Sequence, residues 1–102
     1  MTSPSERIRY EFIDAGACQH LDTINAVSQS ADACEDCLRI GSSWVHLRIC
    51  LSCGHVGCCD DSPNRHARAH HVGSGHPLIR SIEEGETWGW CFEDHILLRP
   101  RP

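Results

Sequence analysis

The sequence has no lysine and is poor in large apolar side chains, with one methionine, one tyrosine and two phenylalanines among 102 residues. A small chain with so few core residues gains only a thin margin of stability from hydrophobic packing alone. We therefore expect disulfides or structural metal, rather than a large core, to hold the fold together.

Membrane and secretion signals are also missing. No apolar run approaches the length of a membrane-spanning helix, and the N-terminus lacks the apolar segment of a secretory signal. We predict a polar leader over residues 1–16, a cytoplasmic location and no membrane partner. Because thiols stay reduced in the cytoplasm, cysteines there are more often metal ligands than disulfide partners.

Basic charge is in deficit. The nine basic residues are all arginine, and with 14 acidic residues the net charge is −5 when histidine is neutral. A surface that binds nucleic acid needs a basic patch. The charge balance therefore argues against a nucleic-acid partner.

Cysteine and histidine, in contrast, are abundant at eight residues each. Four cysteines and five histidines fall between Cys50 and Pro77. Disulfides would not explain why histidines crowd among the cysteines, so we expect these residues to bind metal.

Two C-x-x-C pairs, Cys34 with Cys37 and Cys50 with Cys53, are the clearest ligand motifs. Such a pair lets two thiolates hold one tetrahedral zinc ion from a tight turn. One interpretation is a zinc ribbon with all four thiolates on one ion. That interpretation leaves four downstream residues unexplained: Cys58, His66, His70 and His76.

His66 and His70 lie four residues apart, on one face of a predicted helix. Zinc hydrolases of the H-E-x-x-H type use this spacing to chelate one ion, with the glutamate as general base. Here the intervening residues are Ala, Arg and Ala, so the base is missing. This argues against an enzyme of that class.

Local patterns predict an α+β fold, a twisted antiparallel sheet with one or two helices. Alternation indicates a strand over 44–49, with Val45, Leu47 and Ile49 on one face. Ser62 as N-cap, Pro63 as first helical residue and Gly73 past the end predict a helix over 63–72. Further strands are expected over 76–82, 87–92 and 95–98, with a turn at 83–86, a short strand near 8–13 and a second helix near 21–29. The tail 99–102 is expected to fray, because it cannot extend a strand ladder.

Together these motifs resemble the UBP-type zinc finger of ubiquitin-specific proteases and of a ubiquitin-binding histone deacetylase, particularly its short stand-alone bacterial members. The resemblance rests on the stretches CQHL, CEDC followed by Trp44, CLSCGHVGC, HARAHHVGSGHP and WGWCF. It extends from about Cys18 to Leu98 and implies a domain over 17–98 with cross-braced zinc sites.

The resemblance implies three zinc ions. Matching motif positions assigns the first ion to Cys34, Cys37, Cys58 and His66, the second to Cys50, Cys53, His70 and His76, and the third to Cys18, His20, Cys91 and Asp94. Asp94 stands where some relatives have a cysteine, and its neighbour His95 is the rival ligand. Four protein ligands on each ion leave no open position, which is typical of structural rather than catalytic zinc. Packing or surface positions are expected for the remaining residues of these types: His46, His55, Cys59, His71 and His95.

The resemblance also implies a pocket, because the eukaryotic relatives bind the free C-terminal tail of ubiquitin between aromatic residues and an arginine. Carried over, Trp44, Trp90 and Phe92 line this pocket. Asp60 falls where the relatives have the tail-contacting arginine, and Leu97 replaces a tyrosine. Trp88 is expected in the core.

The predicted function is therefore that of a non-enzymatic, zinc-binding protein-interaction module with a groove for an extended peptide or free C-terminal tail. The substitutions in the pocket predict that ubiquitin itself binds weakly or not at all. The alternative is a structural zinc protein, or a zinc finger associated with nucleic acid, without tail-binding activity.

Overall fold

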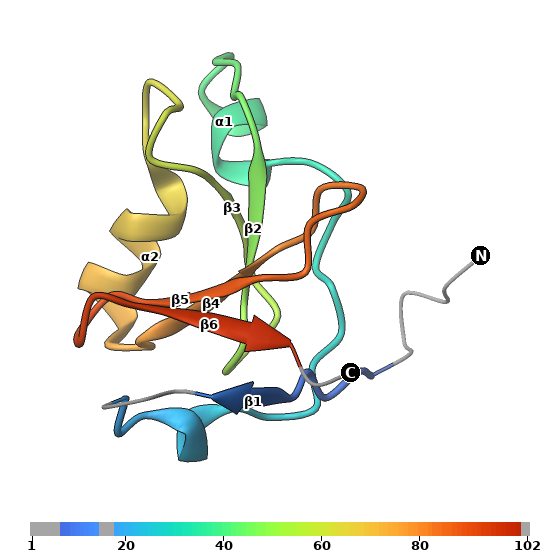
Figure 1. Cartoon of the computed structure of the whole chain (residues 1–102). Helices are drawn as coiled ribbons and strands as arrows, with labels where there is room; N and C mark the ends of the chain where they lie inside the picture. The colour runs from blue at the N-terminus through green and yellow to red at the C-terminus, as the bar shows by residue number, and fades with distance from the viewer. Residues whose placement is uncertain (1–6, 15–17, 101–102) are drawn as a thin grey trace.

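The computed structural model describes residues 7–14 and 18–100, and over these residues the chain has the predicted α+β architecture (Figure 1). Six antiparallel strands form one sheet in the order β1-β6-β5-β4-β2-β3. The elements in chain order are β1 (Phe12–Asp14), the 3-10 turn η1 (Leu21–Thr23), α1 (Glu35–Arg39), β2 (Leu47–Cys50), β3 (Val56–Cys58), α2 (His66–Ser74), β4 (Leu78–Ser81), β5 (Gly89–Cys91) and β6 (Ile96–Pro100). None of these helices is long and apolar enough to cross a membrane.

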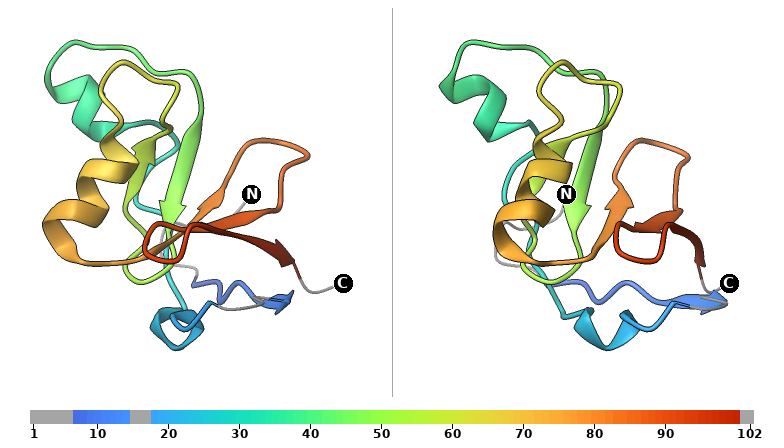
Figure 2. Two further views of the ribbon diagram at one scale, coloured as in Figure 1. Left: turned by 60° about the vertical axis from the view of Figure 1, so that its left-hand side comes forward. Right: turned by 90° about the vertical axis from the view of Figure 1, so that its left-hand side faces the viewer.

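The sheet twists strongly, so that β2 runs steeply across the direction of β5 and β6 (Figures 1 and 2). Both helices lie at the β2–β3 end, where α2 packs on β2 and β3 and α1 packs on β3. The opposite end is closed by β1, which pairs with β6. The metal-ligand candidates therefore gather at the helical end and along the β1–β6 end.

The core is small, as the composition predicts. Five aliphatic side chains are fully buried: Ile49, Leu51, Val56, Leu78 and Leu98. Five cysteines share this depth, with at most 2% of their surface exposed: Cys34, Cys37, Cys50, Cys58 and Cys91. At the fully buried positions of the described residues, thiols are thus as numerous as large aliphatic side chains, so their chemistry is important for stability.

The predicted strand over 44–49 is shorter than the alternation indicates. Leu47 and Ile49 are buried as expected, but β2 begins only at Leu47 and the side chain of Val45 is half exposed. The backbone N–H of Val45 donates to the hydroxyl of Ser62 instead of to a neighbouring strand (2.9 Å). The segment before Leu47 therefore leaves the sheet, and the faces assigned by alternation do not extend to it.

The start of the helix differs from the prediction over 63–72. α2 begins at His66, and Arg65 before it has a left-handed backbone (φ 48°). Ser62 does not cap the helix, because it is buried and its hydroxyl accepts the hydrogen bond from Val45. A tertiary contact thus uses the side chain that the local pattern assigns to the cap.

The end of α2 differs as well. Gly73 lies inside the helix, which continues to Ser74. Gly75 is the residue that turns left-handed (φ 80°), and its N–H donates to the carbonyl of His71 (2.8 Å). This conformation ends helices and suits glycine because glycine has no Cβ.

Two other expectations are wrong. The stretch 21–29 contains only the single turn η1, and the second helix is instead α1, over five residues that follow Cys34. β6 continues through Arg99 and Pro100, which pair with Asp14 and Phe12 of β1. The ladder can include Pro100 because the β1–β6 register is irregular there, where a missing N–H is tolerated.

Candidate metal centres and an adjoining pocket

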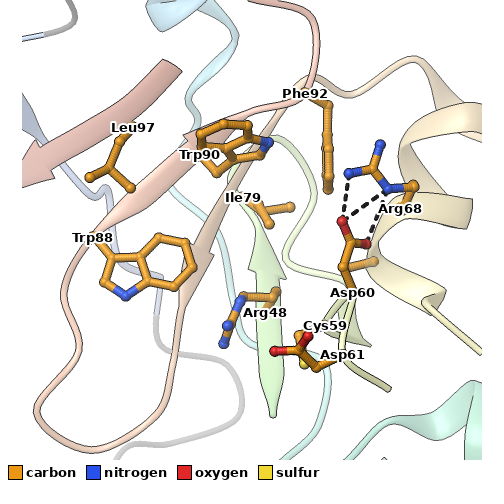
Figure 3. A pocket seen from close by; sticks show the side chains of 11 residues that line it. Arg48, Cys59, Asp60, Asp61, Arg68, Ile79, Trp88, Trp90, Phe92 and Leu97 are labelled. Carbon is orange, nitrogen blue, oxygen red and sulfur yellow. Dashed lines mark hydrogen bonds and ion pairs between the residues drawn. The ribbon is translucent and has the colours of Figure 1, made fainter. Parts of the chain in front are cut away.

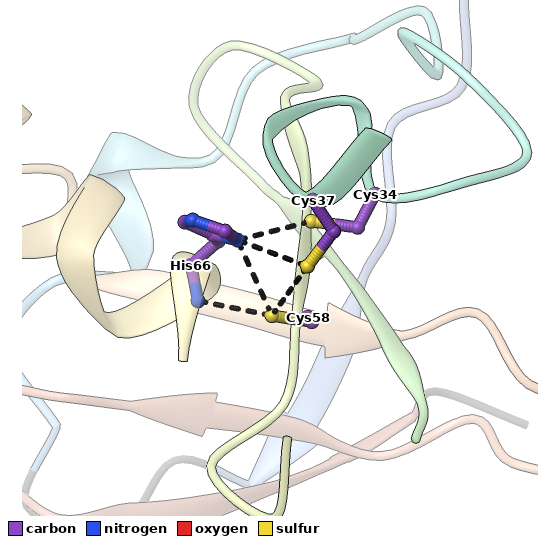
Figure 4. Close-up of side chains that lie close together, drawn as sticks. All are labelled: Cys34, Cys37, Cys58 and His66. Atoms are coloured by element: carbon purple, nitrogen blue, oxygen red, sulfur yellow. Dashed lines mark hydrogen bonds between the residues drawn. The ribbon is translucent and has the colours of Figure 1, made fainter. Parts of the chain in front are cut away.

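The first metal-ligand cluster joins the two helices to the sheet (Figure 4). Cys34 and Cys37 flank the start of α1, Cys58 ends β3 and His66 opens α2. The Nδ1 atom of His66 lies 3.3 Å from the Sγ atoms of Cys34 and Cys37 and 3.5 Å from that of Cys58. One side chain from each of three elements, plus a second from the α1 turn, thus converges on one point.

The second cluster lies one helical turn further along α2. Cys50 ends β2, Cys53 lies in the turn after it, His70 comes from α2 and His76 precedes β4. His70 Nε2 lies 3.3 Å from Cys53 Sγ and 3.3 Å from His76 Nδ1, which is 3.4 Å from Cys50 Sγ. The two C-x-x-C pairs therefore serve different clusters, and the zinc ribbon with four thiolates on one ion is ruled out.

The residue pairs of the first and second clusters alternate along the chain, so the two clusters are cross-braced. His66 and His70 share a face of α2, yet each contributes to a different cluster. They do not chelate one ion as the histidines of an H-E-x-x-H helix do.

The third cluster connects distant parts of the chain. Cys18 and His20 meet Cys91 and Asp94, which lie in and after β5. His20 Nδ1 is 2.8 Å from Asp94 Oδ2 and 3.5 Å from Cys91 Sγ. His95, the rival ligand, does not belong to this group and instead lies beside the ring of Trp90 (6.2 Å between centroids).

The spacing of donor atoms in the first and second clusters matches tetrahedral zinc. Bonds of about 2.3 Å to sulfur and about 2.0 Å to nitrogen place two sulfurs about 3.8 Å apart and two nitrogens about 3.3 Å apart. The Sγ atoms of Cys37 and Cys58 are 3.8 Å apart, and the ring nitrogens of His70 and His76 are 3.3 Å apart. Thiolate and imidazole donors in closed groups of four are the ligand set of structural zinc. The three groups can therefore hold three zinc ions.

Burial favours the protonated form of three cluster thiols, those of Cys34, Cys50 and Cys91. Desolvation raises the pKa of Cys34 to about 12 and the pKa values of Cys50 and Cys91 to about 11. Zinc takes the thiolate form, so binding releases protons and weakens as the pH falls. The backbone N–H of Gln19 and the ring of His20 lower the pKa of Asp94, which favours the carboxylate that a metal needs.

Contacts around the clusters hold the ligands in place. A Cβ on Gly57 of β3 would lie 2.7 Å from the backbone N of Ala67, so glycine is required for α2 to approach β3. His55 stacks on His70 (4.6 Å between centroids), and its Nε2 lies 2.8 Å from the carboxylate of Asp36 in α1. His55, expected to be a packing or surface residue, thus links the surroundings of the first and second clusters.

Beside these clusters lies a pocket of about 300 Å³, between α2 and the face of the sheet formed by β2, β4, β5 and β6 (Figure 3). Three aromatic rings dominate its walls, from Trp88, Trp90 and Phe92. The other lining residues are Arg48, Cys59, Asp60, Asp61, Ala67, Arg68, Ile79 and Leu97. None of the twelve candidate metal ligands is among them.

The structure reverses the predicted positions of Trp44 and Trp88. Trp44 does not line the pocket but packs against the hydrophobic core. It precedes β2, which begins only at Leu47, and so lies outside the sheet. Trp88, expected in the core, lines the pocket with its ring against the guanidinium of Arg48 (4.6 Å to the ring centroid). Trp90, Phe92 and Asp60 lie in the pocket walls (Figure 3).

Asp60 is not an isolated negative charge. Arg68 of α2 donates to both oxygens of the Asp60 carboxylate, from Nε at 3.1 Å and from Nη2 at 2.5 Å (Figure 3). These hydrogen bonds lower the pKa of Asp60. The Arg68 guanidinium also lies over the ring of Phe92 (4.9 Å). The expectation of reversed charge at this wall is therefore wrong, since an arginine from another element neutralises the aspartate.

Arg48, Arg68 and Trp88 are among the pocket residues that the sequence analysis did not assign to the pocket. Alternation places Arg48 on the face of β2 opposite Leu47 and Ile49, which was a usable signal. No local pattern indicates that Arg68 meets Asp60, because their pairing depends on how α2 docks on the sheet.

Metal content gives a direct test of the three clusters. Elemental analysis of untagged protein should give close to three zinc ions per chain, and chelation should abolish the dispersion of the proton NMR spectrum because zinc binding supplies the folding free energy. Cys58→Ser should lose zinc, whereas Cys59→Ser, its neighbour outside the clusters, should keep all three ions. One zinc per chain, or a native-like spectrum after chelation, would contradict this assignment.

The fourth ligand of the third cluster can be tested separately. Asp94→Ala should remove one zinc ion, because it deletes the only carboxylate of the group. His95→Asn should keep three, and asparagine is the suitable replacement because His95 has a left-handed backbone (φ 55°). Mass spectrometry under native conditions counts the ions, and the reverse result would make His95 the ligand.

Known proteins are similar to this chain in sequence. The chain is 31% identical over 88 residues to ubiquitin carboxyl-terminal hydrolase 16 of Rattus norvegicus, which covers 82% of this chain and 10% of that protein. It is 26% identical over 108 residues to histone deacetylase 6 of Caenorhabditis elegans, covering 93% of this chain and 11% of that protein. The chain thus spans about a tenth of the length of these relatives.

A solved structure is similar over most of the fold. The solution NMR structure of a protein from Rhodopseudomonas palustris has 50% sequence identity and a TM-score of 0.74, covering 85% of this chain and 89% of that one. A family profile described as a zinc finger in ubiquitin hydrolases and other proteins matches residues 34–99, well over half of the chain. The chain therefore belongs to this family of zinc fingers.

Proposed function

We propose that this chain is a protein-interaction module whose pocket binds the extended end of another polypeptide, and that it is not an enzyme. The aromatic pocket carries this proposal. The pocket contains none of the candidate metal ligands. Each metal cluster has four protein side chains, which is the number of ligands in a structural zinc site. Metal would then build the fold, and the pocket would contact the partner.

The residue types in the pocket support protein binding. Tryptophan and arginine are enriched among the residues that contribute most to protein interfaces. Here Phe92 stacks on the ring of His71 (5.0 Å) and also contacts the guanidinium of Arg68 (4.9 Å), so side chains of α2 already pack against this wall. A preformed site binds with less loss of conformational entropy.

The size of the pocket supports an extended chain end as the ligand. About 300 Å³ is the lower limit of the usual range for ligand pockets. A folded surface or a helix would not enter such a space, whereas the last few residues of an extended tail would. We place this interaction in the cytoplasm, in keeping with eight cysteines that form no disulfide.

Ubiquitin is the partner that the relatives suggest, and we propose that it binds here weakly or not at all. The family resemblance implies a tail-contacting arginine at the position of Asp60 and a pocket tyrosine at the position of Leu97. Here the carboxylate of Asp60 also accepts hydrogen bonds from Arg68 on the same wall, so the charge of Arg68 is not available to the tail. Both contacts along the tail are therefore missing.

Binding of peptide ends can be tested with a pool of short peptides of random sequence. We expect the pool to shift the indole N–H signals of Trp88 and Trp90 in the NMR spectrum. Trp90→Ala should weaken binding about tenfold or more, because truncating a central aromatic side chain removes a large part of the interface. Trp44→Phe should bind as well as the unmodified domain, because Trp44 lies outside the pocket. No shift at either tryptophan would contradict the proposal.

The ubiquitin prediction requires a separate titration. A peptide with the C-terminal sequence of ubiquitin should bind the unmodified domain with a Kd weaker than about 100 μM. Asp60→Asn should strengthen binding, because it releases the charge of Arg68 for the peptide. A Kd of a few micromolar for the unmodified domain would show that Asp60 does not prevent recognition.

A further inference from the structure

We propose that a second pocket, on the face of the sheet opposite the aromatic pocket, binds a single phosphate group through Arg80. This pocket has a volume of about 370 Å³, and residues 9–12, Arg80 and Thr87 are among those that line it. Its face is set by alternation along β4, because Ile79 lines the aromatic pocket and its neighbour Arg80 lines the second one. The two pockets share no lining residue, so the second can bind its ligand whether or not the aromatic pocket binds a peptide.

Two aromatic side chains of the N-terminal segment form the base of the second pocket. Phe12 is only 7% exposed and lies against Gly89 of β5, where a Cβ would come within 2.9 Å of the phenyl Cζ atom. Gly89 is the partner of Arg80 in the β4–β5 ladder, so the phenyl ring and Arg80 are neighbours on this face. Tyr10 packs against the hydrophobic core, and the guanidinium of Arg80 lies over its ring (4.4 Å to the centroid). The fold thus holds both rings beside Arg80 before a ligand binds.

Arg80 has hydrogen-bond donors to offer in this pocket. It is half-buried, and its Nη1 donates to the carbonyl of Ser81 (2.8 Å). Within residues 7–14 and 18–100, no acceptor is found for its Nε or Nη2, and no buried side-chain nitrogen lacks a partner. These N–H groups must then reach the open space that Arg80 lines. A guanidinium with two such donors can bind a phosphate through paired, charge-assisted hydrogen bonds.

Ion pairing distinguishes Arg80 from the arginines of the aromatic pocket. Arg48, Arg68 and Arg80 each lie over an aromatic ring. Arg48 has the carboxylate of Glu86 at 3.9 Å, and Arg68 is paired with Asp60. Among the side chains that the structure describes, no carboxylate forms an ion pair with Arg80. Arg80 is therefore the arginine of the three whose charge is available to an anion.

The other polar residues of the pocket favour phosphate over a carboxylate. The lining contains a second arginine, Arg9, and one carboxylate, that of Glu11, so positive charge is in excess there although the whole chain carries −5. A phosphate group carries a charge of about −1.5 to −2 and three strong acceptor oxygens. It can accept from Arg80, from Arg9 and from the hydroxyl of Thr87 at once, whereas a carboxylate has two oxygens and a single charge.

The small number of arginines limits the ligand to one phosphate group. Nucleic acid and anionic membranes are bound by many basic side chains, because affinity grows with the number of phosphates that the protein neutralises. Two arginines in a pocket do not form such a surface. The phosphate is therefore that of a small molecule or of a phosphorylated side chain.

The test titrates the full-length, zinc-loaded protein with inorganic phosphate and, separately, with acetate, at constant ionic strength set by sodium chloride. NMR shifts of the arginine Nε–H groups report binding at Arg80. We expect saturable shifts with phosphate and an affinity about tenfold or more above that for acetate, the ratio typical of a lost hydrogen bond to a charged group. The indole N–H signals of Trp88 and Trp90 should stay in place, because these side chains line the other face of the sheet. This comparison needs no variant and does not depend on how a mutant folds.

Two arginine variants locate the phosphate. Arg80→Gln should weaken phosphate binding about tenfold or more. The matched control is Arg48→Gln, because Arg48 also lies over a ring and also donates through Nη1 to the backbone (3.0 Å), but on the opposite face. This control should bind phosphate as the unmodified protein does. Zinc content and spectral dispersion confirm that both variants fold.

A pool of short peptides, each with one phosphoserine, identifies the source of the phosphate. If the pool binds at Arg80 about tenfold or more tightly than inorganic phosphate does, the site takes a phosphorylated side chain. Equal affinities assign it to a small molecule. The proposal is overturned if acetate binds as tightly as phosphate, or if phosphate binding survives in Arg80→Gln and is lost in Arg48→Gln. Peptide binding in the aromatic pocket is read from the tryptophan signals instead, so either site can fail without the other.

Discussion

The fold depends on the convergence of four side chains on each of three points, drawn from segments far apart in the sequence. Among the residues whose burial the structure describes, five large aliphatic side chains are fully buried, so hydrophobic packing alone gives a small core. Other features follow from the convergence. α2 must place His66 and His70 in two clusters one turn apart, and β3 must carry Gly57 so that the helix approaches closely enough. The cluster of Cys18, His20, Cys91 and Asp94 connects the N-terminal segment to the turn after β5, which closes the longest loop of the domain.

Residue types that carry their own chemistry could be predicted from the sequence, whereas geometry set by tertiary contacts could not. Cysteine and histidine occur at densities and spacings that few other structures need, and the three groups implied by the family resemblance are the groups that the fold brings together. The helix start was misplaced because Ser62 satisfies the backbone of Val45, a partner 17 residues away, instead of capping α2. The five-residue helix α1 was missed because it is too short to show periodicity. The environment of Asp60 was misjudged for a similar reason, since its partner Arg68 reaches it only once α2 is docked.

The candidate metal clusters and the aromatic pocket use different residues, but several of these residues are close neighbours in the sequence. The clusters are closed groups of four, and the pocket contains none of their members. The four charged side chains that line it are two arginines and two aspartates. Arg68 pairs with Asp60, and the guanidinium of Arg48 lies over the ring of Trp88. A pocket of balanced charge whose arginines already occupy its aromatic faces differs from the basic surface that nucleic acid requires. It also differs from an aromatic cage, in which the ring faces are open to a cation.

Five residues of the aromatic pocket lie one or two positions from a metal-ligand candidate: Arg48 precedes Cys50 by two, Asp60 follows Cys58 by two, Arg68 follows His66 by two, and Trp90 and Phe92 flank Cys91. In the proposed zinc assignment the ligand candidates fix the backbone from which these neighbours project. Substitutions at these neighbouring positions would alter the shape and charge of the pocket without removing a candidate metal ligand. Under the proposed function, the pocket could therefore acquire a new partner while the scaffold stays the same.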